Sequence, residues 1–136
     1  MALSIDEYDK KCAEVRKENA AYLDIFEKDL QGLSPKTIER HLANVEFYLN
    51  SFLLYSVILR MQDGVYEIGE FLGYYFIRKC MWSTPDTIKS TAASIKKFYK
   101  SMLSHGLIDS VQYRLLADTI KDNMKEWQKE CARYNG

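Results

Sequence analysis

Seven residues whose side chains suit contact with phosphate groups lie between positions 89 and 101 of this 136-residue chain. They are Lys89, Ser90, Ser94, Lys96, Lys97, Lys100 and Ser101. On a helix, the lysines fall at about 80–180° and the serines at about 200–240° from an apolar stripe. Lysines neutralise phosphates, and small hydroxyl residues let a helix approach a nucleic-acid backbone closely. The pattern predicts a phosphate-binding helix face, although a lysine-rich face that meets only solvent has the same composition.

A second polar set lies one helix earlier, at about 160–240° from its own apolar stripe. Its members are Lys36, Arg40, Asn44, Phe47 and Ser51. Arginine and asparagine are side chains that read guanine and adenine edges, so this set is also a candidate for nucleic-acid contact. Phe47 is either a second packing contact or an exposed contact residue, and Glu39 and Glu46 at the border weaken the basic character.

Signals of catalysis are weak throughout the chain. His41 and His105 are far apart, and neither has the spacing of a zinc or iron site. Gly69 and Gly73 lie inside an apolar run, so they do not form a phosphate-binding loop. We therefore expect no enzyme activity, no cofactor and no metal.

The two polar sets belong to helices that begin with a hydroxyl cap followed by proline. Ser34-Pro35 begins a helix that ends between Phe52 and Arg60, and Thr84-Pro85 begins one that His105-Gly106 closes. Both carry apolar residues in a four-three alternation, which predicts one buried stripe each. The stripes are Ile38, Leu42, Val45, Leu49 and Phe52, then Ile88, Ala92, Ile95, Tyr99 and Met102. The two segments also match at an offset of 50, either because capped helices look alike or because the chain holds a pseudo-symmetric pair of hairpins.

Three further helices complete the predicted fold. A capping box at Ser4 and Glu7 begins a helix that reaches Gln31. The segment 66–80 contains two glycines, which weaken a helix but allow close contact with another one. The last helix runs from about Asp109 to Arg133. Its inward-facing residues are predicted to be Val111, Leu115, Ile120, Met124, Trp127 and Cys131.

Composition supports one helical domain. Only 6 glycines and 2 prolines are present, too few for the frequent turns of a β-sandwich or barrel. The longest apolar stretch, 52–59, is too short to cross a membrane. Three widely spaced cysteines without a Cys-x-x-Cys motif predict reduced thiols and a cytoplasmic protein.

Charge is balanced overall but unevenly distributed. The 19 basic and 19 acidic residues cancel. Residues 1–33 hold 5 basic and 8 acidic groups, whereas residues 84–109 hold 4 basic and 2 acidic groups. A domain that depends on phosphate contacts is usually basic, so any such binding is expected to be local and weak.

The two capped helices resemble the SAM-like core-binding domain of phage integrases and other tyrosine recombinases. The opening Leu33-Ser34-Pro35-Lys36-Thr37-Ile38 is similar to the start of that domain. Thr84-Pro85-Asp86-Thr87-Ile88, followed by Phe98-Tyr99 and His105-Gly106-Leu107-Ile108, is similar to its last helix and exit. The similarity covers roughly residues 20–110 and consists of helix starts and apolar spacing.

The resemblance implies a compact four-helix bundle that clamps DNA opposite a separate catalytic domain. By position, its DNA side would hold Lys36, Arg40, Asn44, Lys89, Lys96, Lys97 and Lys100. The family's His-x-x-Arg motif is missing, because Asn44 and Ile108 stand at the third position after the two histidines. The Asn-Pro usual after the exit is also replaced, by Asp109-Ser110. We therefore expect no strand cleavage by this chain, which is either free-standing or cut from a longer recombinase.

Together these patterns predict an all-α domain over residues 1–136, with about five helices. It comprises an N-terminal helix in 1–31, an integrase SAM-like core in 33–108 and a C-terminal helix in 109–136. Its expected function is non-catalytic binding of duplex DNA, alongside a catalytic domain or recombinase partner. The alternative is a protein-interaction module that docks a partner or a second copy near Trp127. The residues expected to be mostly buried are Ile38, Leu42, Val45, Leu49, Ile88, Ile95, Tyr99 and Leu115.

Overall fold

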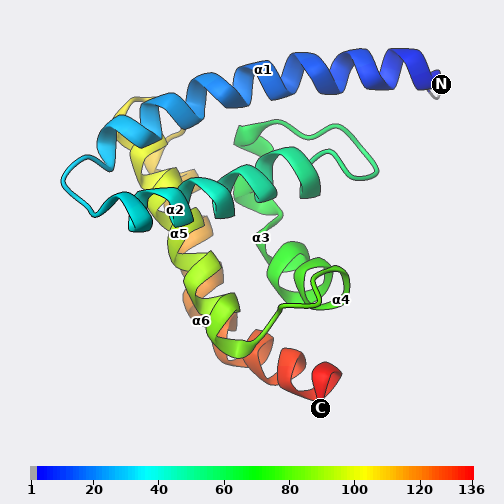
Figure 1. Cartoon of the computed structure of the whole chain (residues 1–136), viewed down its shortest axis with the longest axis vertical. Helices are drawn as coiled ribbons and strands as arrows, with labels where there is room; N and C mark the ends of the chain where they lie inside the picture. Colours follow the sequence, from blue (N-terminus) through cyan, green and yellow to red (C-terminus); the bar gives the residue numbers. More distant parts are fainter. Residues whose placement is uncertain (1–2) are drawn as a thin grey trace.

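The computed structural model describes residues 3–136, which form helices and loops with no β-strand among them. The predicted all-α class is confirmed, and each of the five predicted segments contains helix. Figure 1 shows the long helix α1 (Ile5–Asp29) along one side of the molecule. The C-terminal helix α6 (Ser110–Asn135) ends on the opposite side.

Helix α1 begins at the predicted cap, where Ser4 Oγ accepts a hydrogen bond from the Glu7 amide at 3.1 Å. The buried residues of the helix are Cys12, Val15, Asn19 and Phe26. After the helix, Gly32 has a φ of +105°, a conformation that glycine adopts without strain. The chain therefore reverses here and returns alongside α1 (Figure 1).

Helix α2 (Pro35–Glu46) begins at Ser34, whose Oγ accepts from the Thr37 amide at 3.2 Å. It continues directly into the π-helical segment η1 (Phe47–Phe52). The predicted core residues Val45 and Leu49 are fully buried, but Ile38 and Leu42 are only half-buried. These two line a groove between α1 and α2, so one side of each remains open.

The predicted helix over 66–80 is built from three short consecutive pieces. They are α3 (Ile68–Glu70), the π-helical η3 (Phe71–Tyr75) and α4 (Phe76–Lys79), preceded by the 3₁₀ turn η2 (Met61–Tyr66). The predicted close helix contact occurs at Gly73, where a Cβ atom would lie 2.9 Å from the Trp127 ring of α6. Phe47 packs here as well, because its ring contacts Phe71, Tyr75 and Trp82.

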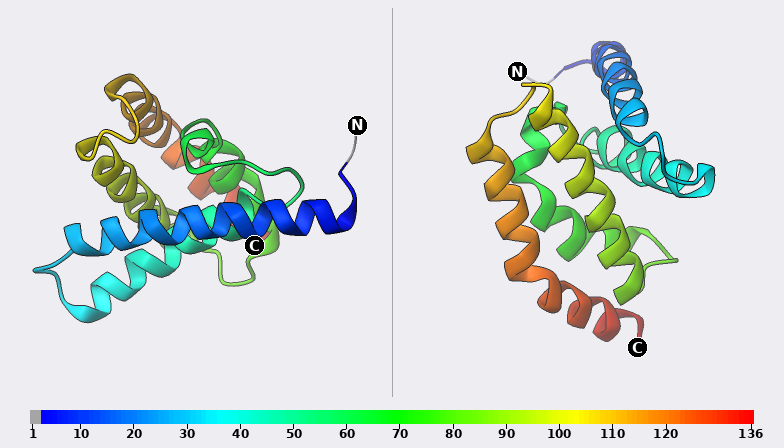
Figure 2. Two further views of the ribbon diagram at one scale, coloured as in Figure 1. Left: turned by 90° about the horizontal axis from the view of Figure 1, so that it is seen from above. Right: turned by 90° about the vertical axis from the view of Figure 1, so that its left-hand side faces the viewer.

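Helices α5 (Pro85–Ser104) and α6 run side by side (Figure 2). Thr84 and Asp109 cap them, accepting from the amides of Thr87 and Gln112 respectively. Of the predicted core residues, Ile88, Ile95 and Tyr99 are fully buried.

The predicted register is wrong in the first turns of α6. Leu115 is 44% exposed and Val111 72% exposed, whereas Leu116 is fully buried. The buried residues Leu116, Ile120 and Trp127 are spaced by four and seven, which is one helix face, whereas Leu115 is rotated about 100° away from it. Trp127 is buried against Gly73 and does not lie at an open end as the alternative hypothesis requires.

Candidate nucleic-acid interface

Helix α5 is covered on two sides, which leaves only a narrow part of it accessible. One side is the predicted stripe, and the second consists of Thr91, Ser94, Phe98 and Ser101, all buried. The second side packs against α1 and α2, since the Phe98 ring meets Phe26 edge-on at 5.4 Å. The prediction that the serines form an outer face is wrong for Ser94, which is 0% exposed, and for Ser101.

The accessible part of α5 spans about 100° of the helix surface. Asp86 and Ser104 are exposed in its first and last turns, and between them it consists of Lys89, Ala93, Lys96, Lys97 and Lys100, all exposed. No acidic residue follows Asp86 on this helix, and none of the four lysines forms an ion pair within residues 3–136. We call these five residues the lysine strip. The four predicted lysines thus share one surface whose charge is not neutralised by the protein.

Helix α2 crosses α5 at a cluster of polar side chains centred on Ser94. Asn44 Nδ2 donates to Ser94 Oγ at 3.0 Å, and His41 Nδ1 lies 2.8 Å from the same oxygen. Asn44, predicted to face DNA, is therefore turned toward α5, because the buried serine needs polar partners. Positions 44 and 94 are also equivalent at the offset of 50, so the two similar helices cross at matching places.

His41 is a buried titratable group at the α2–α5 crossing. Burial lowers the pKa of His41 below its usual 6.5, and the nearby charges of Arg40 and Lys97 lower it further. The positive charges of Arg40 on α2 and Lys97 on α5 thus both disfavour protonation of His41. Lys36 is exposed one turn before Arg40, on the same flank of α2. Sequence patterns do not mark His41 as a site residue, because its partner Ser94 is 53 residues away in the chain.

One acidic group of α1 borders this surface. Phe26, Asp29, Lys97 and Lys100 line a hollow of about 270 Å³ between the end of α1 and α5. The Asp29 carboxylate accepts from Ser101 Oγ at 2.6 Å and contacts His105 Nε2 at 2.9 Å. These contacts lower the Asp29 pKa, the Ser101 hydrogen bond most of all. The charge of Asp29 is thus directed toward Ser101 and His105, and the lysines stay unpaired.

The right-hand view of Figure 2 shows α5 running between α6 and the α1–α2 pair. Helix α6 carries a second row of exposed lysines, Lys121, Lys125 and Lys129. Acidic residues interrupt that row, since Asp118, Asp122 and Glu126 are also exposed on α6. The α5 face is therefore the more uniformly positive of the two.

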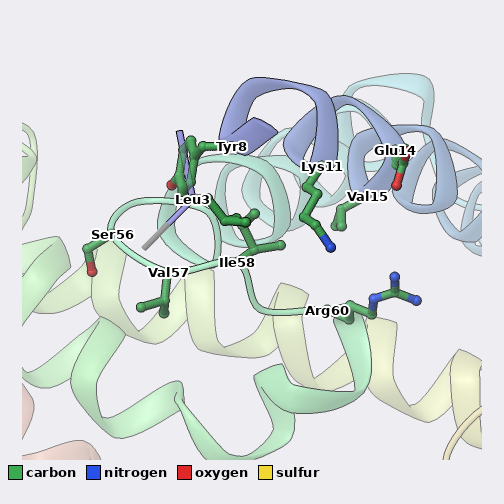
Figure 3. Close-up of a pocket in the computed structure, with 9 residues that line it drawn as sticks. All are labelled: Leu3, Tyr8, Lys11, Glu14, Val15, Ser56, Val57, Ile58 and Arg60. Atoms are coloured by element: carbon green, nitrogen blue, oxygen red, sulfur yellow. The ribbon is translucent and has the colours of Figure 1, made fainter. Parts of the chain in front are cut away.

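Two larger grooves lie away from these lysines. The first, of about 580 Å³, is shown in Figure 3 between α1 and the loop before η2. Val15 of α1 and Ile58 of the loop contribute to its apolar lining, and Lys11, Glu14 and Arg60 are charged groups around it (Figure 3). Arg60 is paired with Glu18 at 3.3 Å, so its charge is already matched. Mixed and paired charges give this groove no clear ligand preference.

The second groove, also of about 580 Å³, lies between α1 and α2. Its floor is apolar, with Ile38, Leu42 and Ala43, and its rim is acidic. The rim residues are Glu27, Glu39 and Glu46. We call this the acidic-rim groove. Glu39 and Glu46 lie on the flank of α2 that faces α1, about 100° around the helix from Arg40.

Residues 3–136 contain no group of three histidine, cysteine or acidic side chains placed to hold a metal ion. None of the helices in this range is long and apolar enough to span a bilayer. The three cysteines are buried and unpaired.

Comparison of the chain with protein-family models, with curated proteins and with solved structures finds no match. The resemblance to recombinase core-binding domains therefore stays a prediction from the helix starts and apolar spacing. The geometry of the lysine strip and of the α2–α5 crossing is independent of that resemblance.

Proposed function

We propose that this chain is a non-catalytic module that binds duplex DNA through its phosphate backbone, with the lysine strip and Arg40 as the contact surface. The observation that carries the proposal is the composition of the exposed part of α5, which holds four unpaired lysines and no acid beyond the first turn. Alanine at position 93 leaves room between the lysines for a backbone to approach. In this proposal Asn44 supports the α2–α5 crossing and does not read a base.

The proposed binding is weak and independent of base sequence. Phosphate contacts carry no sequence information, and non-specific dissociation constants are about 10⁻⁴–10⁻⁶ M at physiological salt. A chain with zero net charge gains no further attraction from the rest of its surface. A role beside a catalytic domain or recombinase partner follows from the resemblance and is part of the same proposal.

The test is a pair of charge-matched double variants. Lys96→Glu with Lys100→Glu reverses two charges of the lysine strip, and Lys121→Glu with Lys125→Glu makes the same change at the same spacing on α6. We expect only the first variant to lose binding to a random duplex at low salt. A third variant, Lys96→Ala with Lys100→Ala, removes the two charges without reversing them. It should reduce the magnitude of the slope of log affinity against log salt by about two, nearly one per lost contact.

All four side chains are exposed, so both double variants should keep the wild-type melting temperature. Amide shifts in an NMR titration should cluster around Arg40, Lys89 and Lys96 and spare the acidic first helix. Full affinity in the Lys96/Lys100 charge reversal would refute the proposed surface. Shifts centred on Lys121 and Lys125 would place the DNA on α6 instead.

A second candidate function is supported by the acidic-rim groove. Ile38 and Leu42 lie on the apolar stripe of α2 yet remain half-exposed on its floor, between three glutamates. A groove of this kind suits an amphipathic helix whose apolar side chains fill the floor and whose lysines or arginines meet the rim. The candidate is therefore a protein-interaction module that recognises a basic amphipathic helix.

A further inference from the structure

A further cavity, of about 460 Å³, lies between the loop that follows η1 and the consecutive elements α3, η3 and α4. Its lining includes four aromatic rings, those of Phe52, Tyr55, Tyr74 and Tyr75. We call it the aromatic pocket. Its volume falls in the range of about 300–1,000 Å³ that is typical of small-molecule sites. Ser56 and Val57 line both this pocket and the groove of Figure 3, so the loop separates the two.

Two π-helical segments bring the rings together. Phe52 is the last residue of η1 and Tyr75 the last of η3. Such turns are rare and occur frequently at functional sites. The Tyr75 ring lies 5.0 Å from that of Phe52 at an interplanar angle of 65°, and 5.4 Å from that of Tyr55 at 71°. The rings therefore lie in different planes around the pocket and do not form a parallel stack.

A positive group of the chain already contacts one of these rings. Lys79 Nζ lies 5.2 Å from the centre of the Tyr55 ring, within the limit of about 6 Å for a cation–π contact. Glu67 and Glu70 line the same pocket, and neither forms an ion pair within residues 3–136. Two carboxylates and one ammonium give the lining a net negative charge. Electron-rich ring faces and excess negative charge together favour a cationic ligand.

The nature of the walls narrows the class of cation. The lining is mostly apolar, with Val57 and Leu59 beside the rings. A primary ammonium is strongly hydrated and carries three hydrogens that need acceptors. A quaternary ammonium has no N–H group, and its positively charged methyl groups pack directly against aromatic faces. The pocket therefore suits a quaternary ammonium better than a primary amine.

We propose that the aromatic pocket binds a quaternary ammonium group between the rings of Tyr55 and Tyr75, with Glu67 and Glu70 supplying the attracting charge. Lys79 is then an internal competitor, because its exposed ammonium contacts the Tyr55 ring in the free protein. The ligand presents a trimethylammonium, either on a small molecule of the choline type or on a trimethylated lysine of a partner. The inference is independent of the proposed function, since the pocket shares no residue with the lysine strip.

The experiment titrates the protein with choline at constant ionic strength and follows the amide shifts by NMR. The matched probe is the neutral carbon isostere of choline, in which a tert-butyl group replaces the trimethylammonium. The two probes have the same shape and differ in charge, so they separate cation binding from apolar burial. We expect choline to shift the amides of the pocket residues and to bind at least about fivefold more tightly than the isostere.

A pair of tyrosine variants tests the position of the site. Tyr55→Leu removes one ring and keeps an apolar side chain. Tyr134→Leu is the matched control, because Tyr134 is similarly exposed and contacts Arg78 through a cation–π interaction outside the pocket. We expect Tyr55→Leu to weaken choline binding about three- to tenfold and Tyr134→Leu to leave it unchanged. Both side chains are exposed, so both variants should keep the wild-type melting temperature.

Two charge variants test the electrostatic part of the proposal. Glu70→Gln removes one attracting charge and should weaken choline binding about twofold or more, because the carboxylate is exposed and partly screened. Lys79→Met removes the internal competitor and should strengthen choline binding by a similar factor. Weaker binding by Lys79→Met than by the wild type would overturn the role of Lys79 as a competitor.

Three results would overturn the site itself. They are no shift of the pocket amides with choline, equal affinity for choline and its neutral isostere, and equal affinity of the wild type and Tyr55→Leu for choline. DNA takes no part in these measurements, so any of the three would leave the proposed function standing.

A short peptide with one trimethyllysine, and the same peptide without methylation, identify the source of the group. Tighter binding of the methylated peptide than of choline would support a modified partner protein, and the reverse order would support a small molecule. Equal binding of the two peptides would refute recognition of a quaternary ammonium on a protein.

Discussion

At the residue scale, single side chains in this protein have roles that their immediate sequence does not reveal. Asn44 lies on an exposed-looking flank of α2 and His41 borders its apolar stripe, yet both contact a fully buried serine of α5. Gly64 lies next to an aspartate and looks like an ordinary turn glycine. In the structure it is buried among Tyr48, Leu53 and Tyr99.

Gly64 and Gly69 form a test pair that separates packing from backbone effects. A Cβ at position 64 would overlap the Tyr99 hydroxyl oxygen and lie 3.0 Å from Leu53 and Tyr48, whereas a Cβ at position 69 meets nothing within 4 Å. We expect Gly64→Ala to lower the free energy of unfolding by about 1–3 kcal/mol through overpacking. Gly69→Ala should raise it by about 0.5–1 kcal/mol, because glycine weakens a helix.

Urea unfolding followed by circular dichroism measures both changes. The Tyr99 hydroxyl donates to the Met61 carbonyl at 2.7 Å and the Tyr48 hydroxyl donates to the Gly64 carbonyl, so displacing either ring also costs a buried hydrogen bond. Equal stability of Gly64→Ala and the wild type would show that η2 moves freely enough to accept the methyl group.

At the element scale, the helix starts were predictable and the helix neighbours were not. Ser34, Thr84 and Asp109 cap their helices through hydrogen bonds within four residues, which the local sequence encodes. The covering of α5 by α1 and α2 depends on contacts such as Phe26 with Phe98, which are 72 residues apart. The periodicity therefore located the first buried side of α5 and missed the second.

Contacts between distant parts of the chain also limited what the sequence could predict about the candidate site and about α6. The four lysines of α5 were found because the chain must leave one helix face polar, whereas the contacts of His41 and Asn44 with Ser94 depend on how two helices cross. In α6, an apolar Leu115 next to an apolar Leu116 left two registers open, and only packing against the rest of the bundle selects Leu116.

The contact between α6 and η3 can be measured as a coupling between two positions. Trp127 is buried directly on Gly73, 2.9 Å from where a Cβ would stand. We expect Trp127→Ala to cost about 3–5 kcal/mol and Gly73→Ala about 1–3 kcal/mol, the first by leaving a cavity and the second by a clash. The clash disappears when the indole is absent, so the double variant should cost clearly less than the two single changes together.

Denaturant unfolding of the wild type, the two single variants and the double variant gives the four free energies of unfolding for this comparison. A variant that fails to fold can be replaced by Trp127→Phe, which retains part of the buried ring and removes the indole nitrogen near Gly73. Additive costs would mean that the two residues do not limit each other's packing, contrary to the geometry.

At the scale of the whole molecule, opposite charges are separated onto different flanks of the same helices. Residues 84–109 are positive and residues 1–33 are negative, so the zero net charge hides two surfaces of opposite sign. The lysine strip lies on α5, whereas Glu39 and Glu46 border the groove between α1 and α2. The two candidate functions therefore use different surfaces and can be separated by mutation.

Because the two surfaces are separate, we expect that each binding activity can be lost by mutation while the other is kept. Glu39→Lys with Glu46→Lys should abolish binding of a designed helical peptide with a leucine stripe flanked by lysines, because the rim would then repel it. The same variant should bind duplex DNA at least as well as the wild type, since it makes the net charge of the chain more positive and leaves the lysine strip unchanged. Lys96→Glu with Lys100→Glu should do the reverse, losing DNA and keeping the peptide.

Fluorescence anisotropy with a labelled duplex and a labelled peptide measures the binding of each ligand to the wild type and to the two charge variants in one buffer. A peptide with its leucines replaced by serine is the matched control, because it keeps the charges and cannot fill the floor at Ile38 and Leu42. Peptide binding that survives this replacement, or that is lost equally in both charge variants, would show a general electrostatic attraction and would remove the groove as a specific site. Loss of DNA binding in the Glu39/Glu46 variant would contradict the division of the surface itself, because added positive charge on a separate flank should not weaken phosphate contacts made by α5.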